Sequence, residues 1–139
     1  MKEYVLGFAF DLDSEIVVLI RKNSPEWQKG LLNGIGGKIE PNEGIFAAMI
    51  RKFKEETGVY IRHWDYIGKL HGAGFIVHIL TAYSNDITLC ETVTDEEVTF
   101  INSNEVITFK DSIIPNLQWI IPLAKQSYGY FPFDIKVID

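Results

Sequence analysis

The stretch GGKIEPNEGIFAAMIRKFKEETGV, residues 36–59, decides how this chain folds. It places glycines and charged side chains at fixed spacing: Gly37, Glu43, Arg51, Glu55, Glu56 and Gly58. From Gly44 to Thr57 it has no proline and no internal glycine, and apolar residues recur every four positions at Ile45, Met49 and Phe53. This spacing predicts a helix with one apolar face, which Gly58 is suited to end.

The two ends of this helix carry the chemically informative residues. Before it lies the segment at residues 33–37, Asn-Gly-Ile-Gly-Gly, which we expect to be a loop whose glycines let backbone groups approach a ligand closely. On the last turn, off the apolar face, lie Glu55 and Glu56, with Arg51 placed to pair with Glu55. Adjacent carboxylates at a helix C-terminus are unfavourable because the helix dipole is negative there. They indicate either a solvated charged helix end or a site for a divalent cation such as Mg²⁺.

The full pattern is more specific than any of its parts. It matches nearly all of the signature G-x5-E-x7-R-E-U-x-E-E-x-G-U, in which U is a bulky apolar residue. Six fixed letters coincide by chance roughly once in ten million positions. The chain therefore resembles the Nudix hydrolases, and in particular MutT-like members that cleave oxidised purine nucleoside triphosphates, the human enzyme among them. The resemblance implies a single domain, residues 1–139, with the Nudix-type α/β/α sandwich around a mixed central sheet.

The resemblance also implies an activity. Nudix hydrolases use Mg²⁺ or Mn²⁺ to cleave a nucleoside diphosphate linked to another group, by attack of water on phosphorus. We therefore expect a pyrophosphohydrolase of nucleoside di- or triphosphates, with oxidised or modified purine nucleotides among the candidate substrates. The alternative is a Nudix domain that binds a nucleotide or a partner protein without efficient hydrolysis.

Roles for single residues follow from the matched positions. The implied metal ligands are the Gly37 carbonyl, Glu55, Glu56 and, from an acidic loop at residues 91–97, Glu96. The implied catalytic group is Glu55 with Arg51 and Glu43, the latter two forming a pair that fixes the helix to the loop. Asn33 matches an asparagine that contacts the purine, and Asn116 falls where acidic residues read the base.

Lys52 departs from the signature, which has glutamate directly after the arginine. That glutamate helps to bind metal and often serves as the general base, whereas a lysine ammonium repels a divalent cation. At about 4 Å and an effective dielectric constant near 20, two unit charges interact by about 4 kcal/mol, and a divalent ion doubles this. We expect Lys52 to turn outward or to pair with Glu56, weakening metal binding; a role as a neutral base is a third possibility.

Positive charge gathers on the N-terminal side of the signature. Arg21, Lys22 and Lys29 lie in the polar segment before the glycines, and Lys38 lies just after them. Arg21, Lys22 and Lys38 are candidates for contact with substrate phosphates; the alternative is an ordinary polar loop.

Composition limits the class of protein. The chain has 139 residues, 47% of them apolar, and a formal net charge of −6, which argues against a broad nucleic-acid surface. The N-terminal apolar run is too short for a signal peptide, and no run is long enough to span a membrane. The single cysteine, Cys90, excludes an internal disulfide and fits a cytoplasmic setting. The expected partner is a small-molecule nucleotide, and the sequence predicts no oligomeric state.

The remaining elements are predicted from local patterns. Alternation and β-branched content predict strands at residues 4–10, 15–21, 60–70, 75–83, 87–90, 98–101 and 134–138. Residues 103–106 suggest the start of a short helix, and residues 115–126 suggest an amphipathic helix in which Pro122 introduces a kink or marks a later start.

Overall fold

The computed structural model describes residues 1–125 and 132–138. The strands are β1 (Lys2–Phe10), β2 (Ile16–Arg21), β3 (Leu32–Asn33), β4 (Ile35–Lys38), β5 (Asp65–Gly72), β6 (Phe75–Tyr83), β7 (Val98–Asn102) and β8 (Phe133–Lys136). The helices are α1 (Ile45–Thr57) and α2 (Leu117–Lys125), and the 3-10 helices are η1 (Glu26–Gln28), η2 (Asn85–Leu89) and η3 (Ser103–Phe109).

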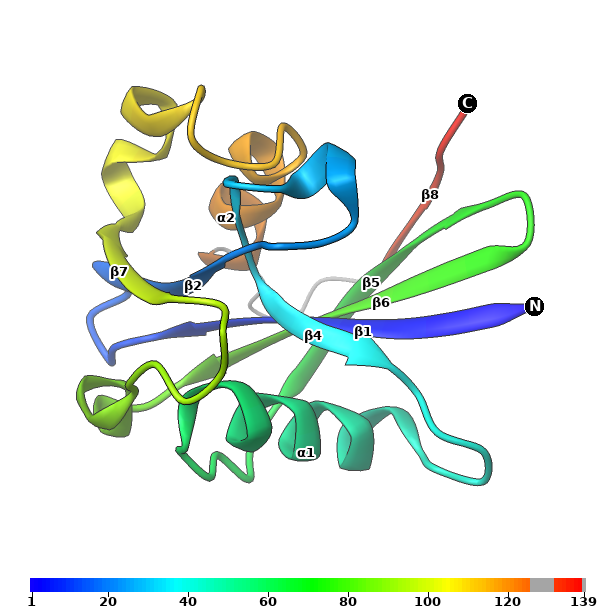
Figure 1. The fold of residues 1–139 in the computed structure, drawn as a ribbon, viewed down its shortest axis with the longest axis horizontal. Coiled ribbons are helices and arrows are strands. Elements are labelled where there is room, and N and C mark those ends of the chain that lie inside the picture. Colours follow the sequence, from blue (N-terminus) through cyan, green and yellow to red (C-terminus); the bar gives the residue numbers. More distant parts are fainter. Residues whose placement is uncertain (126–131, 139) are drawn as a thin grey trace.

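Strand β1 organises the sheet (Figure 1). It runs parallel to β6 along one edge, and its other edge is shared by β4 near its start and β2 near its end, both antiparallel. Beyond β1, β2 pairs with β3 and β7, while β5 pairs with β6 and β8. Within the described residues, eight strands therefore form one sheet in which parallel and antiparallel pairs are mixed.

The two faces of the sheet are covered by different helices, as Figure 1 shows. Helix α1 packs Met49 and Phe53 against Val5 and Ala9 of β1. On the opposite face lies a second core, which contains Phe8 of β1. Helix α2 contributes four buried side chains to it: Leu117, Ile120, Ile121 and Ala124. Burying a large apolar side chain contributes about 1.5–3 kcal/mol, so these two cores hold the helices to the sheet. The predicted α/β/α sandwich with a mixed sheet is confirmed.

The signature helix begins and ends close to its predicted limits. Gly44 is the N-terminal cap of α1, and Gly58 ends the helix in the left-handed conformation, with φ of 79°, which glycine adopts readily. Helix α2 begins at Leu117, two residues after the predicted start, and contains Pro122. The predicted last residue of that helix, Gln126, lies outside the described residues. No helix in the described part of the chain is long and apolar enough to cross a membrane.

Two local predictions are wrong, and the start of one predicted strand is misplaced. The glycine-rich segment at residues 33–37 is not a loop, because β4 pairs with the first half of β1 and Gly36 fits closely over the Val5 carbonyl. Residues 87–89 of the predicted strand at residues 87–90 instead belong to η2, and Cys90 is its C-terminal cap. This 3-10 helix begins at its N-terminal cap, where the Ser84 hydroxyl accepts a hydrogen bond from the Asp86 amide. That cap starts a turn that apolar content alone does not reveal. The strand predicted from residue 60 begins only at Asp65.

The fit between β4 and β1 can be tested at Gly36. A methyl group there would overlap the Val5 carbonyl oxygen, whereas one at Gly44 would meet open space. We expect Gly36→Ala to lower the free energy of unfolding by about 3 kcal/mol, because backbone has to move to admit the methyl group. The control Gly44→Ala is expected to lower it by less than about 1 kcal/mol. Urea unfolding measures both; equal effects would contradict the close fit.

Candidate functional site

Arg51 joins the signature helix to the segment before it. Its guanidinium donates to both oxygens of Glu43, from Nε at 2.8 Å and from Nη2 at 2.9 Å. It also donates to the Lys38 carbonyl oxygen at 3.1 Å and to the Glu55 carboxylate at 3.1 Å. Glu43 Oε1, which accepts from Arg51 Nη2, also accepts a hydrogen bond from the Glu40 amide at 3.0 Å. The predicted pairing of Arg51 with Glu43 is thus present in the structure.

These contacts change the acidity of the groups involved. The hydrogen bond from Arg51 lowers the pKa of Glu43 from 4.5 to about 2, and the same pairing raises the pKa of Arg51. Burial raises the pKa of Glu55, but hydrogen bonds from Arg51 and Lys52 outweigh it, so the net pKa is lowered. Glu43 and Glu55 are therefore held in their charged forms by neighbouring cations.

Lys52 turns toward the two adjacent carboxylates of the helix end. Its Nζ lies 3.3 Å from Glu55 Oε2 and 3.5 Å from Glu56 Oε1. Its alkyl chain lies against Gly37, where any added side chain would collide with it. Of the two arrangements predicted for Lys52, turning outward is wrong and pairing with Glu56 is confirmed, with Glu55 as a second partner.

The acidic loop at residues 91–97 reaches the helix end through a residue that the sequence did not single out. The Thr94 hydroxyl donates to Glu56 Oε2 at 3.2 Å. The Glu96 carboxylate has other partners, accepting from Lys22 Nζ at 3.0 Å and from the Asn23 amide at 2.6 Å. A threonine in a loop carries no pattern that predicts such a contact, so only the folded structure reveals it.

The candidate phosphate-binding side chains differ in whether they already have a partner within the protein. Lys22 is paired with Glu96, and Arg21 donates to the Gly30 carbonyl at 2.8 Å and lies 3.6 Å from Glu97. The Lys38 side chain is exposed and has no ion pair among the described residues. Lys38 is therefore the predicted cation that is most available to a ligand.

The candidate base-contacting residues lie at one end of the sheet. The Asn33 side chain donates to Gln28 at 3.1 Å and accepts from the Gly34 amide at 2.8 Å. Asn116 is exposed just before α2. Backbone hydrogen bonds of Leu32 with residues 112 and 114 join the two segments. Their contact with a base stays a prediction.

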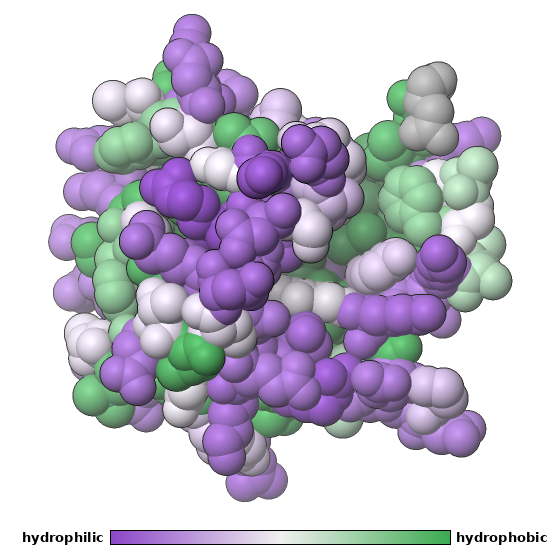
Figure 2. Space-filling view, viewed as in Figure 1, coloured by the Kyte–Doolittle hydropathy of each residue, from purple (hydrophilic) through white to green (hydrophobic). Residues whose placement is uncertain are grey.

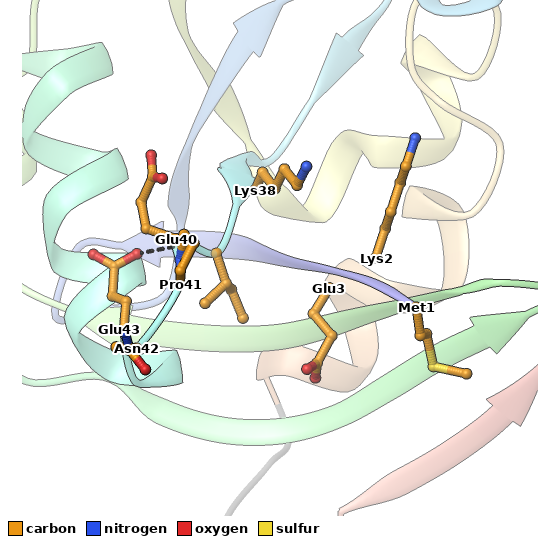
Figure 3. Close-up of a pocket in the computed structure, with 9 residues that line it drawn as sticks. Met1, Lys2, Glu3, Lys38, Glu40, Pro41, Asn42 and Glu43 are labelled. Atoms are coloured by element: carbon orange, nitrogen blue, oxygen red, sulfur yellow. Dashed lines mark hydrogen bonds between the residues drawn. The ribbon is translucent and has the colours of Figure 1, made fainter.

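Two hollows of the described surface could hold parts of a ligand, and one of them lies beside the signature segment. A cavity of about 500 Å³ lies between the start of β1 and residues 38–43. Lys2 and Lys38 extend to one side of β1 there, and Glu3 extends to the other (Figure 3). Figure 2 shows mostly hydrophilic side chains around the loop before α1, and a recess with apolar walls between the α2 side and strands β5, β6 and β8. Trp119 and Phe133 belong to the cluster on this side, with ring centroids 5.8 Å apart.

A comparison with protein families identifies the domain. The family model for the NUDIX domain matches residues 2–120, most of the chain. The chain belongs to the Nudix family. No curated protein sequence matches it.

Solved Nudix structures share its fold. The NUDIX domain of NrtR from Shewanella oneidensis, determined as a complex with ADP-ribose, has a TM-score of 0.74 at 18% identity, covering 89% of this chain and 86% of that one. MutT from Bacillus halodurans has a TM-score of 0.69 at 19% identity, covering 88% and 80%. A MutT structure from work on Aliivibrio salmonicida and Vibrio cholerae has a TM-score of 0.68 at 16% identity, covering 94% and 98%. At these identities the likeness shows the fold alone.

Nudix domains generally use a divalent cation, and the donors at the helix end show whether one fits. Each of the four carboxylate oxygens of Glu55 and Glu56 already has a partner in Arg51, Lys52 or Thr94. Among residues 1–125 and 132–138, no three His, Cys, Asp or Glu side chains gather in a way that could hold a metal ion. In this arrangement the residues do not fit a divalent cation, and the ligand roles of Gly37, Glu55, Glu56 and Glu96 stay predictions.

The contact between Glu43 and Arg51 predicts a specific dependence of stability on pH. Because the pKa of Glu43 is lower in the folded state, its contribution is complete above pH 4.5 and is lost as the pH falls toward about 2. We expect Glu43→Gln to lower the free energy of unfolding by about 2 kcal/mol at neutral pH, and the difference from the natural protein to vanish in acid.

Urea unfolding across this pH range measures the effect, with Glu40→Gln as the control. Glu40 is 65% exposed and lies 4.0 Å from Arg51, so its replacement should change little at any pH. A Glu43→Gln difference that stays constant down to about pH 2 would show that the lowered pKa of Glu43 does not contribute to stability.

Proposed function

We propose that this Nudix domain binds the diphosphate group of a nucleoside di- or triphosphate beside the signature segment and helix, and hydrolyses its phosphoanhydride bond slowly. The observation that carries this proposal is the position of Lys52 between Glu55 and Glu56 and against Gly37. Gly37, Glu43, Arg51, Glu55 and Glu56 match the signature around this residue, but the glutamate that the signature places at position 52 is absent. A general base contributes about 10²–10⁴-fold to a rate, so its loss leaves a slow enzyme.

Several features support a nucleotide as the ligand. The exposed Lys38 supplies a cation next to Gly37 on the strand that carries the signature glycines. The recess with apolar walls offers a place for a planar base, with Trp119 and Phe133 on its side of the sheet. The NrtR domain, which shares the fold, was determined with ADP-ribose, a ligand that contains a nucleoside diphosphate. The resemblance to MutT-like members favours purine nucleotides, oxidised or modified ones included.

A second candidate function is nucleotide or partner-protein binding without hydrolysis. The pairing of all four carboxylate oxygens of Glu55 and Glu56 within the protein favours it, because water attack on phosphorus in this family depends on a cation at these oxygens. Binding measured by calorimetry, with no turnover of any nucleotide, would support this function over the first.

The test is a panel of nucleoside di- and triphosphates, including oxidised purines, assayed with Mg²⁺ and with Mn²⁺ for released phosphate and pyrophosphate. We expect slow release by the natural protein, a rate about a hundredfold higher for Lys52→Glu, and none for Glu56→Gln. Lys54→Glu has the same charge change on an exposed part of α1 and should leave the rate unchanged. No release by either the natural protein or Lys52→Glu would reject the hydrolase.

A further inference from the structure

Five charged side chains meet where the signature segment approaches α1. Three are carboxylates and two are cations, joined by ion pairs of 2.8 to 3.5 Å: Glu43, Glu55, Glu56, Arg51 and Lys52. With all five ionised, the group carries one net negative charge. The side chains of Lys52 and Glu56 are only 19% and 16% exposed, so solvent screens their pairing less than it would at an open surface.

The net charge of these five side chains can be compared with the net charge they would have if position 52 held the glutamate of the signature. With glutamate there, the same five positions would carry three net negative charges, and one divalent cation would return the sum to one. Lysine in place of glutamate changes the fixed charge by two units in the positive direction, which equals the charge of one Mg²⁺ ion. The substitution therefore reproduces the neutralisation that a bound cation would supply.

The position of the Lys52 ammonium is also the one that a bound cation would need. The Lys52 ammonium lies between the two carboxylates, 3.3 Å from one and 3.5 Å from the other. The remaining oxygens of Glu55 and Glu56 accept from Arg51 and Thr94. Contact of the Lys52 alkyl chain with Gly37 keeps the ammonium beside the backbone of β4, and a side chain at Gly37 would displace it. A hard divalent ion would have to remove this cation before it reached the same oxygens.

We propose that the Lys52 ammonium takes the place of one divalent cation in this site. It neutralises Glu55 and Glu56 in the ligand-free domain, so that the natural protein takes up neither Mg²⁺ nor Mn²⁺ there by itself. It also supplies positive charge to the phosphates of a bound nucleotide, so that binding does not depend on a metal ion. Only this second part rests on the function proposed above.

The first part is tested without nucleotide, by thermal unfolding in a chelator and in millimolar MnCl2. A ligand that binds only the folded state raises the unfolding temperature. We expect a rise of less than about 1 °C for the natural protein and of about 4 °C for Lys52→Glu. Electron paramagnetic resonance of free Mn²⁺ counts the bound ions directly. An equal rise, or equal Mn²⁺ uptake, in the natural protein would overturn the proposal.

Two further variants distinguish an effect of the charge at position 52 from a long-range effect of charge elsewhere on the helix. Lys54→Glu changes the charge equally on the same helix, but among the described residues Lys54 makes no side-chain ion pair or hydrogen bond. It should respond to Mn²⁺ as the natural protein does; a response like that of Lys52→Glu would show a long-range charge effect and overturn the proposal. If Lys52→Glu fails to fold, Lys52→Met, which keeps the alkyl chain but not the charge, should still gain a Mn²⁺-dependent rise.

The second part is tested by calorimetric titration with ADP, with and without Mg²⁺. For the natural protein we expect the two dissociation constants to agree within about threefold, and for Lys52→Met we expect binding in chelator to weaken on the order of tenfold. Binding of ADP by the natural protein that disappears in chelator would overturn this part. The metal titration needs no nucleotide, so it decides the first part even if the proposed nucleotide function is wrong.

Discussion

Arg51 fixes the signature helix to the strand and loop that precede it. Its guanidinium reaches both oxygens of Glu43, the Lys38 carbonyl and the Glu55 carboxylate, which belong to the loop, to β4 and to the end of α1. The planar fork of arginine suits such paired contacts, which no lysine could make together. Because β4 is itself bound to β1, these contacts set the position of the helix end relative to the centre of the sheet.

The position of Lys52 follows from this arrangement. It comes directly after Arg51, so its side chain leaves the helix about 100° further round, toward Gly37 rather than toward Glu43. The glycine leaves the space that the alkyl chain fills, and the helix end supplies the carboxylates that the ammonium binds. The Lys52 ammonium, which is covalently attached to the helix, therefore lies between the carboxylates of Glu55 and Glu56.

Prediction from the sequence succeeded where the deciding interactions are local. The helix at residues 45–57, its glycine ends and the pairing of Arg51 with Glu55 depend on residues within about one or two turns of each other. It failed where the partner is distant in the chain. The segment at residues 33–37 becomes a strand only because β1, which is distant in the chain, lies beside it. The other failure is local: η2 replaces a predicted strand because the Asp86 amide donates to the Ser84 hydroxyl, a contact that apolar content alone does not reveal.

The sequence by itself determined the family and the α/β/α architecture, because glycines and charges at fixed spacing constrain backbone and helix faces directly. Only the tertiary structure decided what the predicted site residues contact. It turned Lys52 toward Glu55 and Glu56, brought Thr94 rather than Glu96 to the helix end, and bound Glu96 to Lys22. The physical reason is that each charged side chain pairs with the nearest suitable partner in three dimensions, and that distance depends on how the loops and strands pack.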